Sequence, residues 1–339
     1  MSFITFLHRV ANRENLTEAD ARQAMELVLD GQATTAQIAG FLVALRMKGE
    51  TADELIGFAR AMRSKGTPVL PNLDGHTLLD TCGTGGGGPA TFNISTLAVF
   101  VSAGAGVRVA KHGNRSISTP CGSADILEGL GVNITLPPER IAQSIRDVGI
   151  GFMFAPAMHP AMKHAQPARL EINMRTAFNL LGPLTNPAGA TAQLVGAPSA
   201  STAELMAKAL ASLGLQRGFV VHGSDGLDEI TTTGESLVLE INHGVIVHHQ
   251  LRPEDFGVPA ATLDDLKGGD RQENVEIFLG VLNGEKGPRR DIVLVNASAA
   301  LVAAGRAHDF VEGMELAAQS IDSGAAMRKL EHLRVFTNN

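Results

Sequence analysis

Two short loops of the sequence carry the residue types that bind phosphate groups. The first lies in LLDTCGTGGGGPATFNIST (78–96), where five of the six residues at 83–88 are glycine. A loop without side chains lets backbone N–H groups approach phosphate oxygens, and the N-terminus of a following helix adds partial positive charge. The second loop, KHGNRSIST (111–119), places seven polar donors within nine positions. Together the two loops predict a site for a phosphate-bearing ligand.

The distribution of charge supports an anionic ligand. The chain has 28 Lys and Arg against 35 Asp and Glu, a formal net charge of −7, without the basic blocks expected of a nucleic-acid-binding protein. Between Thr81 and Ser123, however, there is no Asp or Glu, while Arg108, Lys111 and Arg115 fall in that stretch. A buried parallel-sheet unit would also lack acids, but would have little use for cations beside a glycine. We therefore expect a small anionic partner and no nucleic acid.

The common nucleotide-binding patterns fit the glycine loop poorly. Gly83, Gly85 and Gly88 formally match G-x-G-x-x-G, but no carboxylate follows until Asp125, so the acid expected to bind a ribose about 20 residues later is missing. Pro89 stands where a Walker loop would need lysine. The usual folds for NAD and ATP are therefore disfavoured.

The first 66 residues predict three short helices. Their expected N-terminal caps are Thr17, Thr35 and Thr51, and their expected ends lie near Gly31, Gly49 and Gly66. TPVLPNLDG (67–75) is the expected linker. We predict a helical domain over residues 1–70, to which helices from about 158–185 could add.

After His76 the pattern changes to alternating strands and helices. Apolar runs at 78–80, 107–110, 150–154, 192–197 and 218–223 alternate with helical patterns at 94–104, 123–130, 137–147 and 202–213. Residues 236–250 indicate a hairpin that turns at 242–244. This order predicts an α/β domain over 75–339, with a mostly parallel central sheet flanked by helices.

Composition indicates a globular protein that needs no covalent staples. The chain has 339 residues, of which 44% are hydrophobic, and only two cysteines. MSFITFLHRV lacks the apolar segment of a signal peptide, and no apolar run approaches the roughly 20 residues of a membrane span. We expect a cytoplasmic enzyme or binding protein without a membrane partner.

Five segments occur in the order found in a known family. They are DTCGTGGGGPATFNIST, KHGNRSISTPCGSADILEGLG, GFMFAPAMHPAM, RTAFNLLGPLTNPAG and GLDEI, and they span 80–230. The chain thereby resembles the anthranilate phosphoribosyltransferases of tryptophan biosynthesis. The resemblance implies the fold of the nucleoside phosphorylase and phosphoribosyltransferase type. It also implies transfer of the phosphoribosyl group of 5-phosphoribosyl 1-pyrophosphate to anthranilate, with Mg²⁺ as cofactor, in a homodimer.

The resemblance also implies roles for individual residues. The expected donor-binding residues are Gly83, Gly86, Gly87, Thr91, Asn93, Ile94, Ser95, Thr96, Lys111, His112, Gly113, Asn114, Arg115, Ser116, Ile117, Ser118, Thr119 and Ser123. The expected anthranilate-binding residues are Gly83, His112, Asn114, His159 and Arg169, and the expected metal ligands are Ser95, Asp228 and Glu229. Lys111 and Arg169 are the expected catalytic residues: Lys111 would stabilise the leaving pyrophosphate, and the Arg169 fork suits a carboxylate.

One position departs from the family pattern, and two other functions stay open. Gly87 stands where the family usually has aspartate.

A pyrimidine-nucleoside phosphorylase would share the helical-plus-α/β plan and a similar glycine loop. A non-catalytic relative that binds a ligand or nucleic acid is the second alternative. Taken without the resemblance, Arg169 fits a helix-surface residue better, and His112 and His159 fit packed structural residues equally well.

Overall fold

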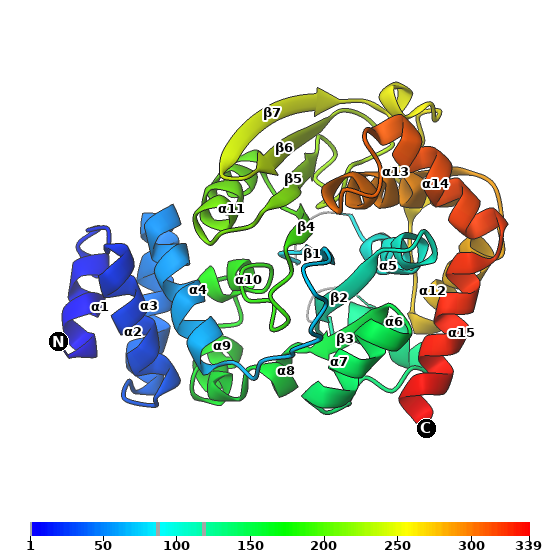
Figure 1. Ribbon diagram of the computed structural model, residues 1–339. Helices are drawn as coiled ribbons and strands as arrows, with labels where there is room; N and C mark the ends of the chain where they lie inside the picture. The colour runs from blue at the N-terminus through cyan, green and yellow to red at the C-terminus, as the bar shows by residue number, and fades with distance from the viewer. Residues whose placement is uncertain (1, 86–88, 117–119) are drawn as a thin grey trace.

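The computed structural model describes residues 2–85, 89–116 and 120–339. At the N-terminus four helices form a bundle, seen at one end of the molecule in Figure 1. They are α1 (Phe3–Ala11), α2 (Glu18–Leu29), α3 (Thr35–Lys48) and α4 (Ala52–Lys65). The sequence predicted three of them and missed α1, whose nine residues follow directly on the start of the chain.

The cap of α3 corrects one prediction. Thr34, not Thr35, is its N-cap: the Thr34 hydroxyl accepts from the Gln37 N–H, and the Gln37 side chain accepts from the Thr34 N–H. This reciprocal pair needs a Gln or Glu three residues after the cap, which only Thr34 has. Thr51 and Glu54 form the same arrangement at α4, as predicted.

A seven-stranded sheet occupies the centre of the molecule. The spatial order of the strands is β3-β2-β1-β4-β5-β6-β7. The first five strands in this order are parallel to one another, and β6 and β7 add an antiparallel hairpin. The strands are β1 (Leu78–Gly83), β2 (Arg108–Gly113), β3 (Ile150–Phe154), β4 (Ala192–Gly196), β5 (Arg217–Gly223), β6 (Ser236–Asn242) and β7 (Val245–Leu251). The mostly parallel sheet and its hairpin confirm the predicted fold class.

Helices cover both faces of this sheet (Figure 1). Those between the strands are α5 (Ile94–Gly104), α6 (Ser123–Gly129), α7 (Pro138–Asp147), α8 (Ala155–Met158), η1 (Pro160–His164), α9 (Gln166–Ile172), α10 (Ala177–Leu181) and α11 (Ala200–Ser212). After the hairpin come η2 (Pro253–Phe256), η3 (Asp264–Leu266), α12 (Arg271–Leu282), α13 (Pro288–Ala303), α14 (Phe310–Asp322) and α15 (Ala325–Asn338). Among the described residues, no helix combines the length and the apolar character needed to cross a membrane.

Alternating strand residues divide the core into two main layers. Leu194 and Phe219 pack with α5, α13 and α15, whereas Val195 and Val220 pack into a cluster shared with α11 and the helical bundle. This is the alternation expected when both faces of a sheet are covered. Ala168 and Phe178 belong to the second cluster, so α9 and α10 pack with the bundle although they lie far along the chain.

Candidate active site

The two predicted phosphate loops follow neighbouring strands. The glycine loop begins at the end of β1, and the second loop begins at the end of β2, the next strand in the sheet. The β1–β2 ladder pairs only Leu78 with Arg108 and Leu79 with Val109, while β1 pairs with β4 as far as Gly83. Strands β2 and β3 lie on one side of β1, and β4 and β5 lie on the other, so the order of the strands reverses between β1 and β4. Ligands of open α/β sheets bind at such a point, beyond the carboxyl ends of the strands.

An acidic turn, residues 226–230, lies against this crevice. A Cβ atom on Gly83 would stand 2.5 Å from an Asp228 carboxylate oxygen, and one on Gly196 would stand 1.7 Å from the Asp228 carbonyl oxygen. A side chain at position 196 would collide with the main chain of the turn, so the end of β4 must be glycine, whereas one at position 83 would displace the Asp228 carboxylate. The end of β5 is bonded to the same turn, because the Gly223 N–H donates to the Leu227 carbonyl at 2.9 Å.

The two carboxylates of the turn reach the glycine loop and the start of α5. The Asp228 carboxylate lies near the Gly85 N–H, and the Glu229 carboxylate lies near the Ser95 N–H, and both N–H groups favour the charged form. Partial burial raises the pKa of both carboxyl groups, and with the added repulsion of Asp228 the pKa of Glu229 rises to about 8. A cation placed between them would relieve this repulsion.

These residues fit Mg²⁺. Carboxylate oxygens are ligands that Mg²⁺ prefers, and the ion usually takes only one or two of them from protein while substrate phosphates and water complete its shell. Among the residues that the structure describes, no group of three or more His, Cys, Asp or Glu could hold a metal ion. Two adjacent carboxylates, Asp228 and Glu229, with Ser95 beside them, match the few protein ligands of an ion that is shared with a phosphate substrate.

Lys111 lies inside the sheet, next to the acidic turn. Its Nζ donates to the Thr81 carbonyl at 2.6 Å, and its side chain is almost entirely buried. Burial lowers its pKa, although the charges of Asp80 and Glu229 oppose this shift. Asp80 in turn accepts from the Asn186 amide at 2.7 Å and from the His112 N–H at 3.2 Å. One of the three ammonium N–H donors is used by the Thr81 carbonyl.

Arg115 in the second loop is paired with the chain's own carboxylates. Its guanidinium group donates to both Glu128 oxygens at 2.6 and 2.7 Å and to Asp125 at 3.1 Å. Asp125 also accepts from the Ser116 and Gly122 N–H groups at 3.1 and 2.9 Å. Both acids stand just beyond the acid-free stretch of the sequence, so the local positive charge predicted there is partly neutralised by α6.

The remaining described residues join the start of α5 and the second loop to the segment that leads into α6. Asn93 precedes α5 without making the side-chain cap that its type allowed; its amide donates to the Cys121 carbonyl at 3.1 Å, and its Oδ1 is buried without a partner. The Ser123 hydroxyl donates to the Asn114 carbonyl at 3.2 Å, and a Cβ on Gly113 would meet that hydroxyl. Of the other predicted donor residues, Ile94 and Thr96 are buried in the first turn of α5, and Thr91 forms a bridge with Lys267.

Two histidines and an arginine surround α10. The rings of His112 and His159 lie 5.1 Å apart, and His112 Nδ1 contacts the Gly182 carbonyl at 3.1 Å. Both Nε2 atoms are buried and have no hydrogen-bond partner among the residues that the structure describes. Burial lowers the pKa of His112 to about 3 and that of His159 to about 4, so both rings are neutral. The Arg169 guanidinium lies 5.2 Å from the Phe178 ring, and no carboxylate of the described residues lies within ion-pair distance.

Comparison with known proteins connects this site to one family. Residues 4–66 match the helical bundle domain, and residues 75–327 the a/b domain, of a glycosyl transferase family. The anthranilate phosphoribosyltransferase of Solibacter usitatus is 63% identical over 99% of both chains, and that of Geobacter sp. is 53% identical over 97% of both. The chain belongs to the anthranilate phosphoribosyltransferase family.

Solved structures of anthranilate phosphoribosyltransferases share the whole fold. The Thermus thermophilus enzyme has a TM-score of 0.93 at 43% identity and covers 100% of both chains. The Saccharomyces cerevisiae enzyme, in complex with PRPP and Mg, has a TM-score of 0.90 at 28% identity, covering 99% of this chain and 98% of that one. The resemblance read from the five sequence segments is thereby confirmed.

In this anthranilate phosphoribosyltransferase fold the structure adds residues that the sequence did not single out. Asp80 lies near Lys111 and is held by Asn186, and Gly196 makes room for Asp228. Arg175, in the RTAFNLLGPLTNP segment, lies close enough to Asp228 for its charge to oppose the rise in that pKa. An aspartate directly after the apolar pair Leu78–Leu79 was a usable signal for Asp80, whereas Gly196 gave none, because its partner is distant in the sequence.

Five predicted donor-site residues lie outside the described residues. They are Gly86, Gly87, Ile117, Ser118 and Thr119. Their roles, including the consequence of glycine at position 87, stay predictions.

Proposed function

We propose that the residues gathered at the ends of β1, β2 and β4 carry out the reaction of the family. The enzyme transfers the 5-phosphoribosyl group of 5-phosphoribosyl 1-pyrophosphate to the amine of anthranilate, which gives N-(5-phosphoribosyl)anthranilate and pyrophosphate in tryptophan biosynthesis. The observation that carries the proposal is the acidic turn packed against Gly83 and Gly196, whose two carboxylates lie beside the glycine loop, the start of α5 and Lys111.

The phosphoribosyl donor lies across the two loops. Backbone N–H groups of the glycine loop and the N-terminal end of α5 face its phosphates, and Asn93, Asn114 and Ser123 hold the loops in register. Asp228 and Glu229 would hold Mg²⁺ beside Ser95; when bound, this ion neutralises charge on the departing pyrophosphate. Lys111 adds a buried positive charge on the same side.

Anthranilate lies on the side of α9 and α10. Arg169 meets its carboxylate, because a planar guanidinium group pairs with a carboxylate through two hydrogen bonds. His112 and His159 line the approach as neutral rings, whose unpartnered Nε2 atoms offer polar contacts to the acceptor. The aromatic amine needs little acid–base assistance, so catalysis rests on alignment of the substrates and on stabilisation of the leaving group.

The loss of anthranilate fluorescence in the presence of donor and Mg²⁺ tests the function. The chain has no Trp or Tyr, so its own emission is small. We expect Arg169→Ala to raise the KM for anthranilate by about 10-fold or more, the loss expected when a bidentate charged contact is removed. Arg140→Ala, which removes an arginine stacked 4.2 Å from Phe336, serves as the matched control.

Three outcomes would overturn the assignments. A change confined to the KM of the phosphoribosyl donor would remove Arg169 from the acceptor site. Phosphate-dependent cleavage of thymidine or uridine would favour a nucleoside phosphorylase. Absence of product together with salt-sensitive DNA binding would favour a non-catalytic relative.

We also propose two domains, over residues 1–70 with about 158–185 and over 75–339. The hydrogen bonds from Thr67 N–H to the Met158 carbonyl and from Arg63 to the Leu184 carbonyl support this grouping, because they join the bundle to the α8–α10 segment. A cytoplasmic location, with no nucleic-acid or membrane partner, stays a prediction.

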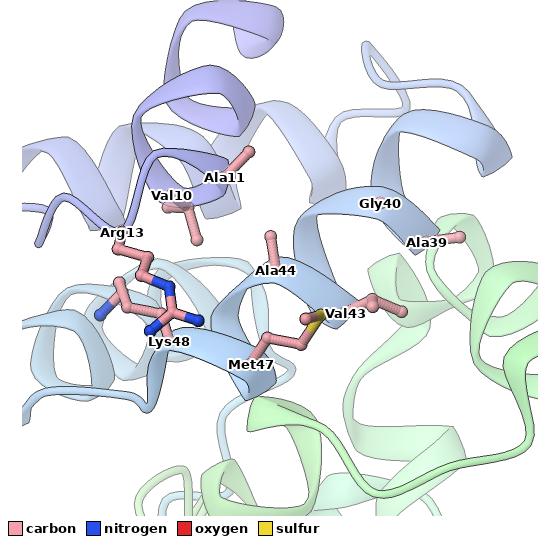
Figure 2. Close-up of a pocket in the computed structure, with 9 residues that line it drawn as sticks. All are labelled: Val10, Ala11, Arg13, Ala39, Gly40, Val43, Ala44, Met47 and Lys48. Atoms are coloured by element: carbon pink, nitrogen blue, oxygen red, sulfur yellow. The ribbon is translucent and has the colours of Figure 1, made fainter.

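The proposed assembly is a homodimer formed through the helical bundle. A pocket of about 390 Å³ opens between α1 and α3 and is lined by Val10, Ala11, Arg13, Ala39, Gly40, Val43, Ala44, Met47 and Lys48 (Figure 2). Most of these side chains are small or apolar, and Met47 is 72% exposed. An exposed apolar surface of this kind is typical of an interface between subunits.

A further inference from the structure

One buried amide fixes the main chain directly after the acidic turn's second carboxylate. Asn296 lies on α13 and is fully buried. Its Oδ1 accepts from the Ile230 N–H at 3.0 Å, and its Nδ2 donates to the Ile230 carbonyl and to the Ile292 carbonyl, both at 2.9 Å. Both main-chain groups of the residue that follows Glu229 are thus held by one side chain.

The same turn is held from two other sides. Asp225 accepts from the Leu227 N–H at 3.0 Å and from the hydroxyls of Thr231 and Thr233 at 2.6 and 2.5 Å. The end of β4 fits against the turn only because Gly196 has no side chain. Leu227 and Ile230 of the turn pack in the same buried cluster as α13, and Asn296 adds the hydrogen bonds between the turn and that helix.

We propose that Asn296 is a positioning residue for the Asp228–Glu229 pair, a role that rests on the proposed function. The two adjacent carboxylates repel each other, and Mg²⁺ tolerates little deviation from octahedral geometry. A turn held only at its ends would let Glu229 swing away from the Ser95 N–H. Asparagine is suited to the position because its amide both accepts and donates, as the two groups of Ile230 require.

The decisive variant is Asn296→Asp, which keeps the shape of the side chain. An aspartate can still accept from the Ile230 N–H, but it has no donor for the Ile230 carbonyl. We expect the Mg²⁺ concentration for half-maximal activity to rise about 10-fold, the lower end of the loss seen when an outer-shell partner of a metal ligand is removed, with an unchanged KM for anthranilate. The matched control is Ser298→Ala on the same helix, since Ser298 is equally buried but donates to the Phe310 carbonyl at 2.7 Å.

Two readouts do not depend on turnover. Mn²⁺ binding in the presence of pyrophosphate, followed by electron paramagnetic resonance, should weaken in Asn296→Asp and not in Ser298→Ala. Hydrogen exchange of the wild-type protein should show the Ile230 amide protected, and this measurement stands even if the variant does not fold. Fast exchange at Ile230, or equal Mn²⁺ affinity in Asn296→Asp and wild type, would overturn the proposal. If the wild type itself makes no product, the proposed function fails instead.

Discussion

Single residues at the site are constrained by close approach as much as by charge. Gly196 shows this, because a Cβ there would overlap the Asp228 carbonyl oxygen at 1.7 Å. Asn93 is a second case: its type suggested a helix cap, but its amide bonds the Cys121 carbonyl and so joins one phosphate loop to the other. Both residues are constrained by main-chain carbonyl groups of other segments, that of Asp228 for Gly196 and that of Cys121 for Asn93.

The buried histidines make stability depend on pH. The pKa values of His112 and His159 fall to about 3 and about 4 in the folded protein, from an ordinary 6.5, chiefly because burial disfavours the charged ring. Below pH 6.5 the unfolded chain therefore binds more protons than the folded protein. The free energy of unfolding has its highest contribution from these histidines above pH 6.5 and decreases as the pH drops toward 4. By pH 5 each histidine accounts for a loss of about 2 kcal/mol.

Urea titrations at pH 7.5 and pH 5 measure this effect. His159→Gln removes one of the two titrating rings. Between pH 7.5 and pH 5 the free energy of unfolding of this variant should therefore fall by about 2 kcal/mol less than that of the wild type. His76, an exposed histidine of the linker, provides the control variant His76→Gln, which should lose as much as the wild type. Equal losses in all three proteins would contradict the assignment of neutral buried rings.

At the scale of elements, helix α13 does more than cover the sheet. The sequence presents it as an alanine-rich segment, and thirteen of its sixteen residues are buried. Arg290 in its first turn donates to both oxygens of Asp322 at the end of α14, at 2.6 and 2.9 Å. This pair and the Asn296 contact join α13 to α14 on one side and to the acidic turn on the other.

The cap of α3 gives a prediction that distinguishes two adjacent threonines. Thr34→Ala should lower the free energy of unfolding by about 1 kcal/mol, because it removes one half of a capping box. Thr35→Ala should change it by a few tenths of a kcal/mol, since Thr35 is already inside the helix. Denaturant unfolding of both variants checks this. The reverse order would mean that the helix begins one residue later than the structure has it.

At the scale of the whole molecule, the bundle and the sheet share one hydrophobic cluster. Phe41 and Leu55 of the bundle belong to the same buried cluster as Met206 of α11 and Val220 of β5. The bundle is therefore packed firmly against one face of the sheet layer, at the end of the molecule opposite α12–α15 (Figure 1). This leaves the α1 and α3 surface facing outward.

The proposed dimer can be tested on that surface. Met47→Asp places a charge in the exposed apolar pocket of Figure 2, and we expect it to weaken association by at least 10-fold, since a buried unpaired charge is strongly unfavourable. Val335 on α15 is also exposed, at 57%, so Val335→Asp is the matched control. Sedimentation velocity over a range of concentrations measures both. A stable dimer in Met47→Asp, or a monomeric wild type, would exclude this interface.

The sequence determined the local parts of this protein. Hydrophobic periodicity, caps and glycine stops depend on neighbouring residues, so most helices and strands could be placed, and ordered motifs identified the family. The tertiary structure alone decided which distant groups meet: Asp228 against Gly83 and Gly196, Arg115 against Glu128, and Asn296 around Ile230. No local pattern encodes such pairs, because they exist only once parallel strands have brought their carboxyl ends to one edge and helices have packed on both faces.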